Sequence, residues 1–161
     1  MKQRKYVEQY ERMERWFKIY EKINDGILVS PSVTFESVIT SEIYRDYVFF
    51  FFQNCYHLKD WIIYDFNNKA VTKKVESFVN DNFCMSLCAD LCNSIKHLSL
   101  KKSRSKRNPE FTAIPDYTEV KEGKKSFIYI QWFVKANGEY IDAFQIATEC
   151  MKKWAEFINA L

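Results

Sequence analysis

Glycine and proline are scarce in this sequence, which has only three of each in 161 residues. Antiparallel sandwiches and barrels need many tight turns, and tight turns draw on these two residue types. An all-β fold is therefore disfavoured, and long helices with few connections are the natural alternative. Histidine is scarcer still, with two in the chain, so few imidazoles are available for proton transfer near neutral pH.

Long apolar runs and a strong charge bias are also missing. The most apolar run, residues 47–52, is far shorter than the roughly 20 residues that cross a bilayer. Residues 1–6 carry charge and lead into no apolar signal sequence. The net charge of +3 is too small to argue for nucleic-acid binding by itself. With 17% aromatic residues, disorder is excluded. We expect one soluble, cytoplasmic domain over residues 1–161, without membrane contact.

The five cysteines are an odd number, which suggests free thiols in a reducing compartment. Cys84, Cys88 and Cys92 recur every four residues beside apolar positions of one helix. Zinc sites usually combine two cysteines that lie two to four residues apart on a turn with a second, distant pair. The sequence has no such arrangement. We therefore expect these thiols to pack as small core residues, with no metal and no other cofactor. A nucleophilic Cys55 or Cys92 is the alternative, but no spacing supports it.

Apolar periodicity predicts a mainly α fold, a bundle of four or five helices. The expected helices cover residues 3–24, 41–64, 69–79, 82–98 and 142–160. Residues 127–134 are rich in β-branched and aromatic side chains and predict a strand, and Asn137-Gly138 is a strong hairpin signal. The partner strand lies in residues 111–120 or just after 138. We expect a small β-hairpin insertion, at about residues 110–140, before the C-terminal helix.

Each histidine belongs to a polar face of its helix. Helical spacing puts His57 on one face with Asp46, Gln53 and Asp60. It likewise puts His97 on one face with Ser86, Asp90 and Asn93. If the two faces meet, they form a polar cleft in which an imidazole could act as general acid or base. Otherwise both faces are simply solvated.

A basic segment follows the second of these helices. Its cations are Lys101, Lys102, Arg104, Lys106 and Arg107. Such clusters attract phosphate backbones in a salt-sensitive way. A solvated, mobile loop is the alternative.

The segment Cys92-Asn93-Ser94-Ile95-Lys96-His97 resembles the signature of the HEPN superfamily (higher eukaryotes and prokaryotes nucleotide-binding domain). That signature is an Arg, often followed by Asn, and then a His four to six residues on. Asn93 and His97 match it, whereas Cys92 stands where the Arg would be. Two segments, Tyr56–Trp61 and Ala89–His97, also look like those of a group of uncharacterised bacterial proteins. The resemblance covers about residues 40–161.

The resemblance implies a helical domain that binds or cleaves RNA or a nucleotide, in bacterial defence or a toxin–antitoxin system. Many HEPN members are metal-independent ribonucleases and others are non-catalytic. Without the Arg, either Lys96 or a loop cation replaces it or catalysis is lost. The expected catalytic residues are His97 as acid or base, Asn93 and Asp90 as its neighbours, and His57 with Asp60 opposite. The expected phosphate-binding residues are Lys96, Lys101, Lys102, Arg104, Lys106 and Arg107.

A non-catalytic interaction module is the alternative function. In that case the conspicuous aromatic residues would form a dimer or partner surface, because large exposed apolar patches usually mark contacts. The candidates are Phe49, Phe50, Phe52, Trp132 and Phe133. Both interpretations are compatible with a homodimer, and a protein partner fits the second.

Overall fold

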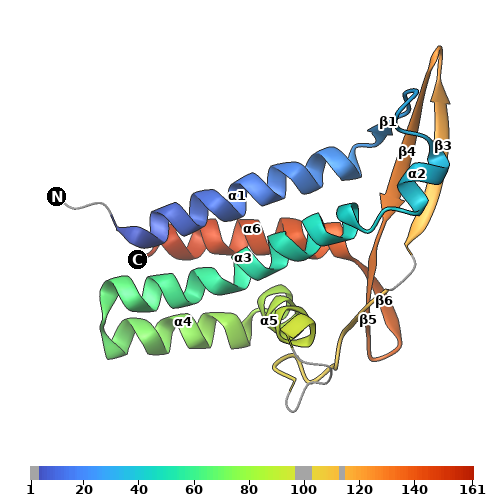
Figure 1. Cartoon of the computed structure of the whole chain (residues 1–161). Helices are drawn as coiled ribbons and strands as arrows, with labels where there is room; N and C mark the ends of the chain where they lie inside the picture. The colour runs from blue at the N-terminus through green and yellow to red at the C-terminus, as the bar shows by residue number, and fades with distance from the viewer. Residues whose placement is uncertain (1–3, 97–102, 113–114) are drawn as a thin grey trace.

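Six helices and six short strands make up the described part of the chain, which is residues 4–96, 103–112 and 115–161 of a computed structural model (Figure 1). The helices are α1 (Lys5–Asn24), α2 (Phe35–Ile39), α3 (Ile43–Phe66), α4 (Lys69–Asp81), α5 (Phe83–Lys96) and α6 (Ala143–Asn159). The strands are β1 (Ile27–Leu28), β2 (Glu110–Phe111), β3 (Asp116–Glu122), β4 (Lys125–Gln131), β5 (Phe133–Ala136) and β6 (Glu139–Asp142). The mainly helical prediction is confirmed.

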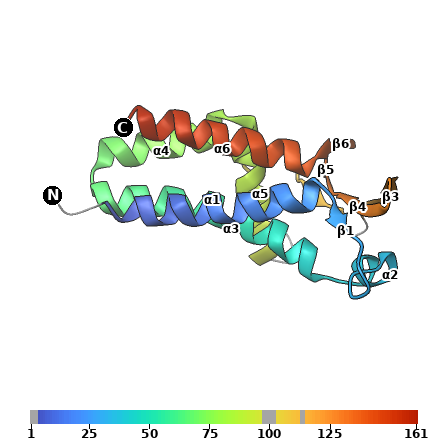
Figure 2. The ribbon, with the colours of Figure 1, turned by 90° about the horizontal axis from the view of Figure 1, so that it is seen from above.

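Three long helices, α1, α3 and α6, run side by side, and α4 folds back along α3 (Figure 1). Helix α5 crosses this layer at a steep angle and contacts α3, α4 and α6 (Figure 2). The strands gather at one end of the bundle, away from the N- and C-termini. No helix among the described residues is both long and apolar enough to span a lipid bilayer.

Side-chain caps fix where several helices begin. Asn68 caps α4, because its side-chain oxygen accepts a hydrogen bond of 2.7 Å from the N–H of Ala70. Asp142 caps α6 by accepting 2.7 Å from the N–H of Phe144. Thr34 and Ser37 form a reciprocal capping box on α2. This short helix lies between the helices expected over residues 3–24 and 41–64, where no helix is predicted.

The β region is more than the single hairpin that was predicted. Strands pair antiparallel in two three-stranded sheets, β1-β4-β3 and β2-β5-β6. Both proposed partner segments are used, because β3 pairs with β4 while β6 pairs with β5. The hairpin at Asn137-Gly138 is confirmed, with φ values of 52° and 83° that suit a tight turn. Strand β1 comes from the connector after α1, which periodicity could not reveal.

The core lies between the helical layers and extends into the sheets. Phe51, Leu58 and Ile62 lie at helical spacing on α3 and are fully buried, as apolar periodicity predicts for one face of this helix. Phe52 and Trp132 are also buried, at 0% and 2% exposure. Neither residue can therefore form part of a partner surface: α3 is covered on more than one side at Phe52, and Trp132, between β4 and β5, packs in the core. Phe49 and Phe133 are half-buried, and Phe50 is 42% exposed.

Candidate functional site

The carboxylate of Asp90 anchors the start of the described basic loop. Asp90 is fully buried on α5, at 0% exposure. It accepts hydrogen bonds of 2.7 Å from the hydroxyl of Ser103 and 2.7 Å from the N–H of Arg104. It also accepts bonds from the N–H of Ser105 at 2.9 Å and from its hydroxyl at 2.7 Å. The residue predicted to orient His97 therefore holds residues 103–105 against α5.

The anchored loop delivers Arg104 to an ion network between α3 and α4. Its guanidinium donates to Glu76 at 2.9 Å and to Asn80 at 3.0 Å. Lys59, nearly buried on α3, contacts Asp60 at 2.6 Å and Glu76 at 3.4 Å. Burial lowers the pKa of the Lys59 ammonium, but Asp60, Tyr56 and Glu76 outweigh it, so the pKa is raised.

The two cations of this network, Lys59 and Arg104, face two carboxylates, Asp60 and Glu76, so the opposite charges largely cancel. Burial raises the pKa of Glu76, but its contacts with Arg104 and Lys59 outweigh this and lower that pKa overall. The ring of Tyr56 has cations near it, with Lys59 Nζ at 5.0 Å and Arg104 Cζ at 5.8 Å from its centroid. Arg104 is thus bound by Glu76 and Asn80, and these contacts attach the loop to α4.

His57 lies on an exposed part of α3 and faces the C-terminal half of α5. Its Nε2 is 4.0 Å from the sulfur of Cys92, and its ring is exposed. Asn93 is half-buried on α5, next to Cys92 in the chain. The structure thus brings His57 together with the segment that carries the resemblance. His97 itself lies outside the described residues.

The remaining predicted cations divide into two groups. Arg107 contacts Glu139 at 3.4 Å, and its guanidinium lies 4.7 Å from the centroid of the Phe83 ring. Lys106 is exposed, with a positive φ of 58°. Lys101 and Lys102 lie outside the described residues, and the side chain of Lys96 is not described either.

An open hollow of about 370 Å³ lies beside the predicted residue Asp60. Its other lining residues are Lys5, Trp61 and Tyr64. Asp60, Trp61 and Tyr64 follow His57 by three, four and seven residues, so all four share one face of α3. Lys5 Nζ lies 5.4 Å from the centroid of the Tyr64 ring, and Tyr64 is 71% exposed.

Sequence analysis missed the aromatic part of this face. Trp61 enters the sequence prediction only within the Tyr56–Trp61 segment, and Tyr64 only as the last residue of the expected helix over 41–64. The i, i+4 and i+7 spacing from His57 was readable and marks one exposed stripe. The contribution of Lys5 was not readable, because it depends on α1 packing beside α3.

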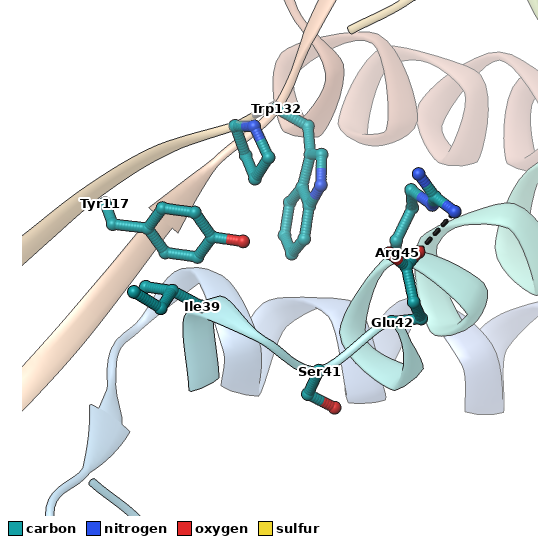
Figure 3. Close-up of a pocket in the computed structure, with 7 residues that line it drawn as sticks. Ile39, Ser41, Glu42, Arg45, Tyr117 and Trp132 are labelled. Carbon is teal, nitrogen blue, oxygen red and sulfur yellow. Dashed lines mark ion pairs between the residues drawn. The ribbon is translucent and has the colours of Figure 1, made fainter. Parts of the chain in front are cut away.

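A second hollow, of about 230 Å³, lies where the start of α3 meets the sheets (Figure 3). Arg45 and Trp132 line it together with Ile39, Ser41, Glu42, Pro115 and Tyr117. Arg45 pairs with Glu42. Within the described ranges, the buried Nε of Arg45 and Nε1 of Trp132 have no hydrogen-bond partner. This hollow thus presents two N–H donors suited to an oxygen acceptor, and none of the predicted site residues lies in it.

The burial of four of the five cysteines agrees with the predicted core packing. The described cysteines form no disulfide, and Cys55, Cys88, Cys92 and Cys150 are buried while Cys84 is half-buried. Because Cys55 is 0% exposed, it has no open approach for a substrate, and the nucleophile alternative loses support there.

Comparison with known proteins returns no relative on which a function could rest. No family model matches the chain, and no curated protein or solved structure matches it. The HEPN likeness therefore stays a prediction from the quoted residues, and the functional argument depends on the geometry of the site.

Proposed function

We propose that this chain is a HEPN-like domain that binds RNA or a nucleotide along the exposed face of α3. The observation that carries the proposal is the hollow of about 370 Å³ lined by Lys5, Asp60, Trp61 and Tyr64. His57 lies one helical turn away on the same face. Single-strand-binding proteins combine aromatic platforms with cations in this way, because bases stack and phosphates are negatively charged.

The cations near the aromatic rings support this assignment. Lys5 lies near the ring of Tyr64, and the guanidinium of Arg12 lies 5.6 Å from the centroid of the Trp61 ring. A base stacked on either ring would have its phosphate within reach of a cation. Three arginines are engaged by protein groups: Arg104 by Glu76 and Asn80, Arg12 by Glu8 and Gln9, and Arg107 by Glu139. Phosphate contacts are therefore assigned first to Lys5 at the hollow and to the exposed Lys106 at the loop.

Cleavage, where it accompanies binding, needs a proton acceptor and a proton donor. The acceptor takes the proton of the ribose 2′-hydroxyl, whose oxygen attacks the adjacent phosphorus. The donor protonates the departing 5′-oxygen, so no metal ion is required. An exposed His57 beside Cys92 supports one imidazole at this place, and His97, five residues after Cys92 in the sequence, supplies the second in this proposal.

The test measures binding and cleavage separately. Single-stranded RNA is titrated with the full chain at two salt concentrations, and cleavage is followed in the presence of a metal chelator. We expect binding to weaken steeply with salt. Replacing His57 or His97 with Ala should leave binding within a few-fold and slow cleavage by about 10²–10⁴-fold.

The possible outcomes separate the two parts of the proposal. A chain indifferent to RNA at both salt concentrations contradicts it altogether. Salt-sensitive binding with equal cleavage by wild type and His97→Ala retains the binding function and removes the catalytic one.

The alternative remains a non-catalytic interaction module. Apolar side chains on and beside α2 favour it, since Phe35, Ile39 and Ile43 are 36%, 41% and 49% exposed. Size-exclusion chromatography with light scattering discriminates between the two functions. A tight dimer that ignores RNA supports the interaction module.

A further inference from the structure

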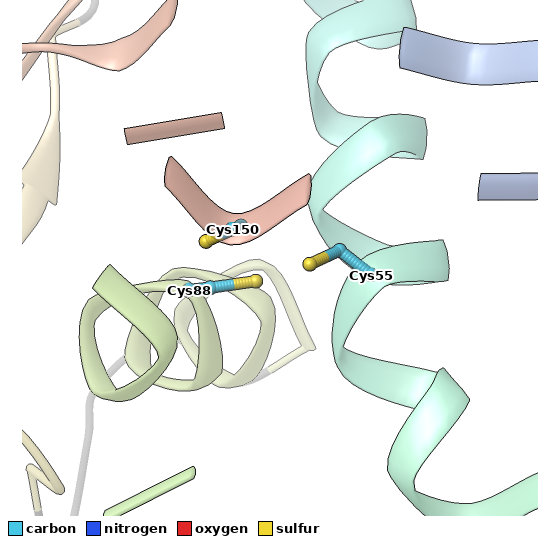
Figure 4. Close-up of side chains that lie close together, drawn as sticks. All are labelled: Cys55, Cys88 and Cys150. Carbon is cyan, nitrogen blue, oxygen red and sulfur yellow. The ribbon is translucent and has the colours of Figure 1, made fainter. Parts of the chain in front are cut away.

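Three buried thiols converge on one point in the core, from three different helices (Figure 4). Cys55 comes from α3, Cys88 from α5 and Cys150 from α6. Their sulfur atoms all lie within 4.8 Å of one another, and each residue is 0% exposed. Cysteines that merely fill a core have no reason to share one point, whereas ligands of one ion must do so.

A fourth cysteine stands at the edge of this group. Cys84 precedes Cys88 by one helical turn on α5 and is half-buried. The thiol of Cys150 donates a hydrogen bond of 3.4 Å to the carbonyl oxygen of Cys84. Four of the five cysteines in the chain are therefore gathered at the junction of α3, α5 and α6.

We infer that this cluster binds one zinc ion, with Cys55, Cys88 and Cys150 as buried ligands and Cys84 as the fourth ligand. Four thiolates in tetrahedral geometry are a common structural zinc site, with Zn–S distances of about 2.3 Å. Tetrahedral geometry then requires sulfur atoms roughly 3.8 Å apart. The three buried sulfur atoms need to close in only slightly, whereas the Cys84 sulfur, which is not part of the 4.8 Å group, has to move toward them.

The surroundings act in opposite directions on the pKa values of the four thiols, so the proposal depends on the convergence of the sulfur atoms. Burial raises the pKa of the Cys55 thiol, but hydrogen bonds from Cys150, Cys88 and Trp154 outweigh it and lower that pKa to about 5. A hydrogen bond with Cys150 lowers the pKa of Cys84, against the effect of burial. Burial chiefly keeps the pKa values of Cys88 and Cys150 well above the usual range.

The N-terminus of α5 favours a thiolate at Cys84 alone. Cys84 is the second residue of α5, where backbone N–H groups at the helix N-terminus stabilise a thiolate. Binding then replaces each remaining S–H proton by an S–Zn bond and releases that proton to solvent. Because Cys84 is half-buried, it also offers the ion a route from solvent to the three buried sulfur atoms.

Zinc binding is tested on the full chain, which is kept reduced and freed of bound metal with a chelator. Zn²⁺ is titrated against a chromophoric competitor, and Co²⁺ serves as a spectroscopic probe of the same ligands. We expect one ion per chain and the visible bands of a tetrahedral thiolate site. Replacing Cys55 or Cys150 with Ser should weaken Zn²⁺ binding about 100-fold or more. Cys92→Ser, one turn beyond Cys88 on α5, is the matched control and should bind as wild type.

A measurement on the unaltered chain guards against variants that fail to fold. Alkylation of Cys84 is followed by mass spectrometry with and without Zn²⁺. Zinc ligation predicts at least a ten-fold slower reaction of this half-buried thiol. Three results overturn the inference: no thiolate bands with Co²⁺, an unchanged alkylation rate at Cys84, or binding of Cu⁺ alone, which would indicate a three-thiolate site.

Discussion

The backbone N–H of Arg104 donates a hydrogen bond of 2.7 Å to the buried carboxylate of Asp90, fourteen residues earlier in the chain. A buried residue of α5 therefore fixes the position of the backbone at the described start of the basic loop. A carboxylate that sequence analysis placed on a polar, substrate-facing stripe proves to be a structural anchor. The cations of the loop therefore depend on a group that no solvent molecule reaches.

Replacing Asp90 with Ala should destabilise the fold by about 3 kcal/mol, because several half-buried donors of residues 103–105 lose their acceptor. Chemical denaturation measures the change in the free energy of unfolding. Limited trypsin digestion should also cut faster after Arg104 and Arg107. The exposed Asp81→Ala, at the end of α4, is the control and should shift stability by less than about 0.5 kcal/mol. Equal effects of the two changes would contradict the anchor.

The Glu76 carboxylate should make stability depend on acid. Burial opposes the shift, but contacts with Arg104 and Lys59 lower its pKa in the folded state. A lowered folded pKa contributes stability above the unfolded value of about 4.3, and this is lost as pH falls through the folded pKa. Urea unfolding between about pH 6 and pH 3 should therefore show a smaller acid loss in Glu76→Gln than in wild type. Parallel pH profiles would contradict the prediction.

The two aromatic residues of α3 that line the hollow, half-buried Trp61 and exposed Tyr64, should determine RNA affinity. Base stacking on an aromatic side chain contributes about 1–3 kcal/mol, so Trp61→Ala or Tyr64→Ala should weaken binding roughly 5- to 150-fold. Tyr140→Ala is the matched control, because Tyr140 is 62% exposed but lies on β6. Fluorescence anisotropy with labelled single-stranded RNA measures all three variants. If Tyr140→Ala weakens binding as much as the other two, the platform is not on α3.

Gly26 should tolerate no side chain. Its φ is +102°, and an added Cβ would lie 3.0 Å from ring atoms of Tyr129. We expect Gly26→Ala to destabilise the chain by about 2–3 kcal/mol. Gly123→Ala tests the backbone contribution alone, since φ is +60° there and a Cβ meets nothing within 4 Å. The first change should lower the thermal midpoint clearly more than the second, and the opposite order would contradict the packing of β1 against β4.

Apolar periodicity predicted the long helices to within a few residues because each buries one continuous stripe. The stripe of α3 at Phe51, Leu58 and Ile62 is an example, and all three are fully buried. Local signals also sufficed at Asn137-Gly138, where the turn geometry is intrinsic to the two residues. Strand β1 was missed because two residues are too few to show a periodic pattern. It is a strand only because it pairs with Phe127 and Ile128 of β4.

The site was less predictable than the fold. Helical spacing shows which residues share a face of a helix, but it does not show which other elements pack against that face. Asp90 shares a face with Asn93, as expected from spacing, yet the returning loop buries it. His57 and Cys92 are far apart in sequence, and their approach depends on the steep crossing of α5 over α3. Ion partners such as Glu76 for Arg104 come from a third helix, which no local pattern indicates.

Trp132 is the one residue between β4 and β5, and so between the two sheets. Along this single stretch of chain Ile128, Ile130, Trp132 and Val134 are all buried with the helices. The β region therefore closes the core at this end of the bundle. Removing it would expose the apolar side chains that pack there to water. Grafts and tags belong instead at the outer tip near Gly123, where an added atom meets open space.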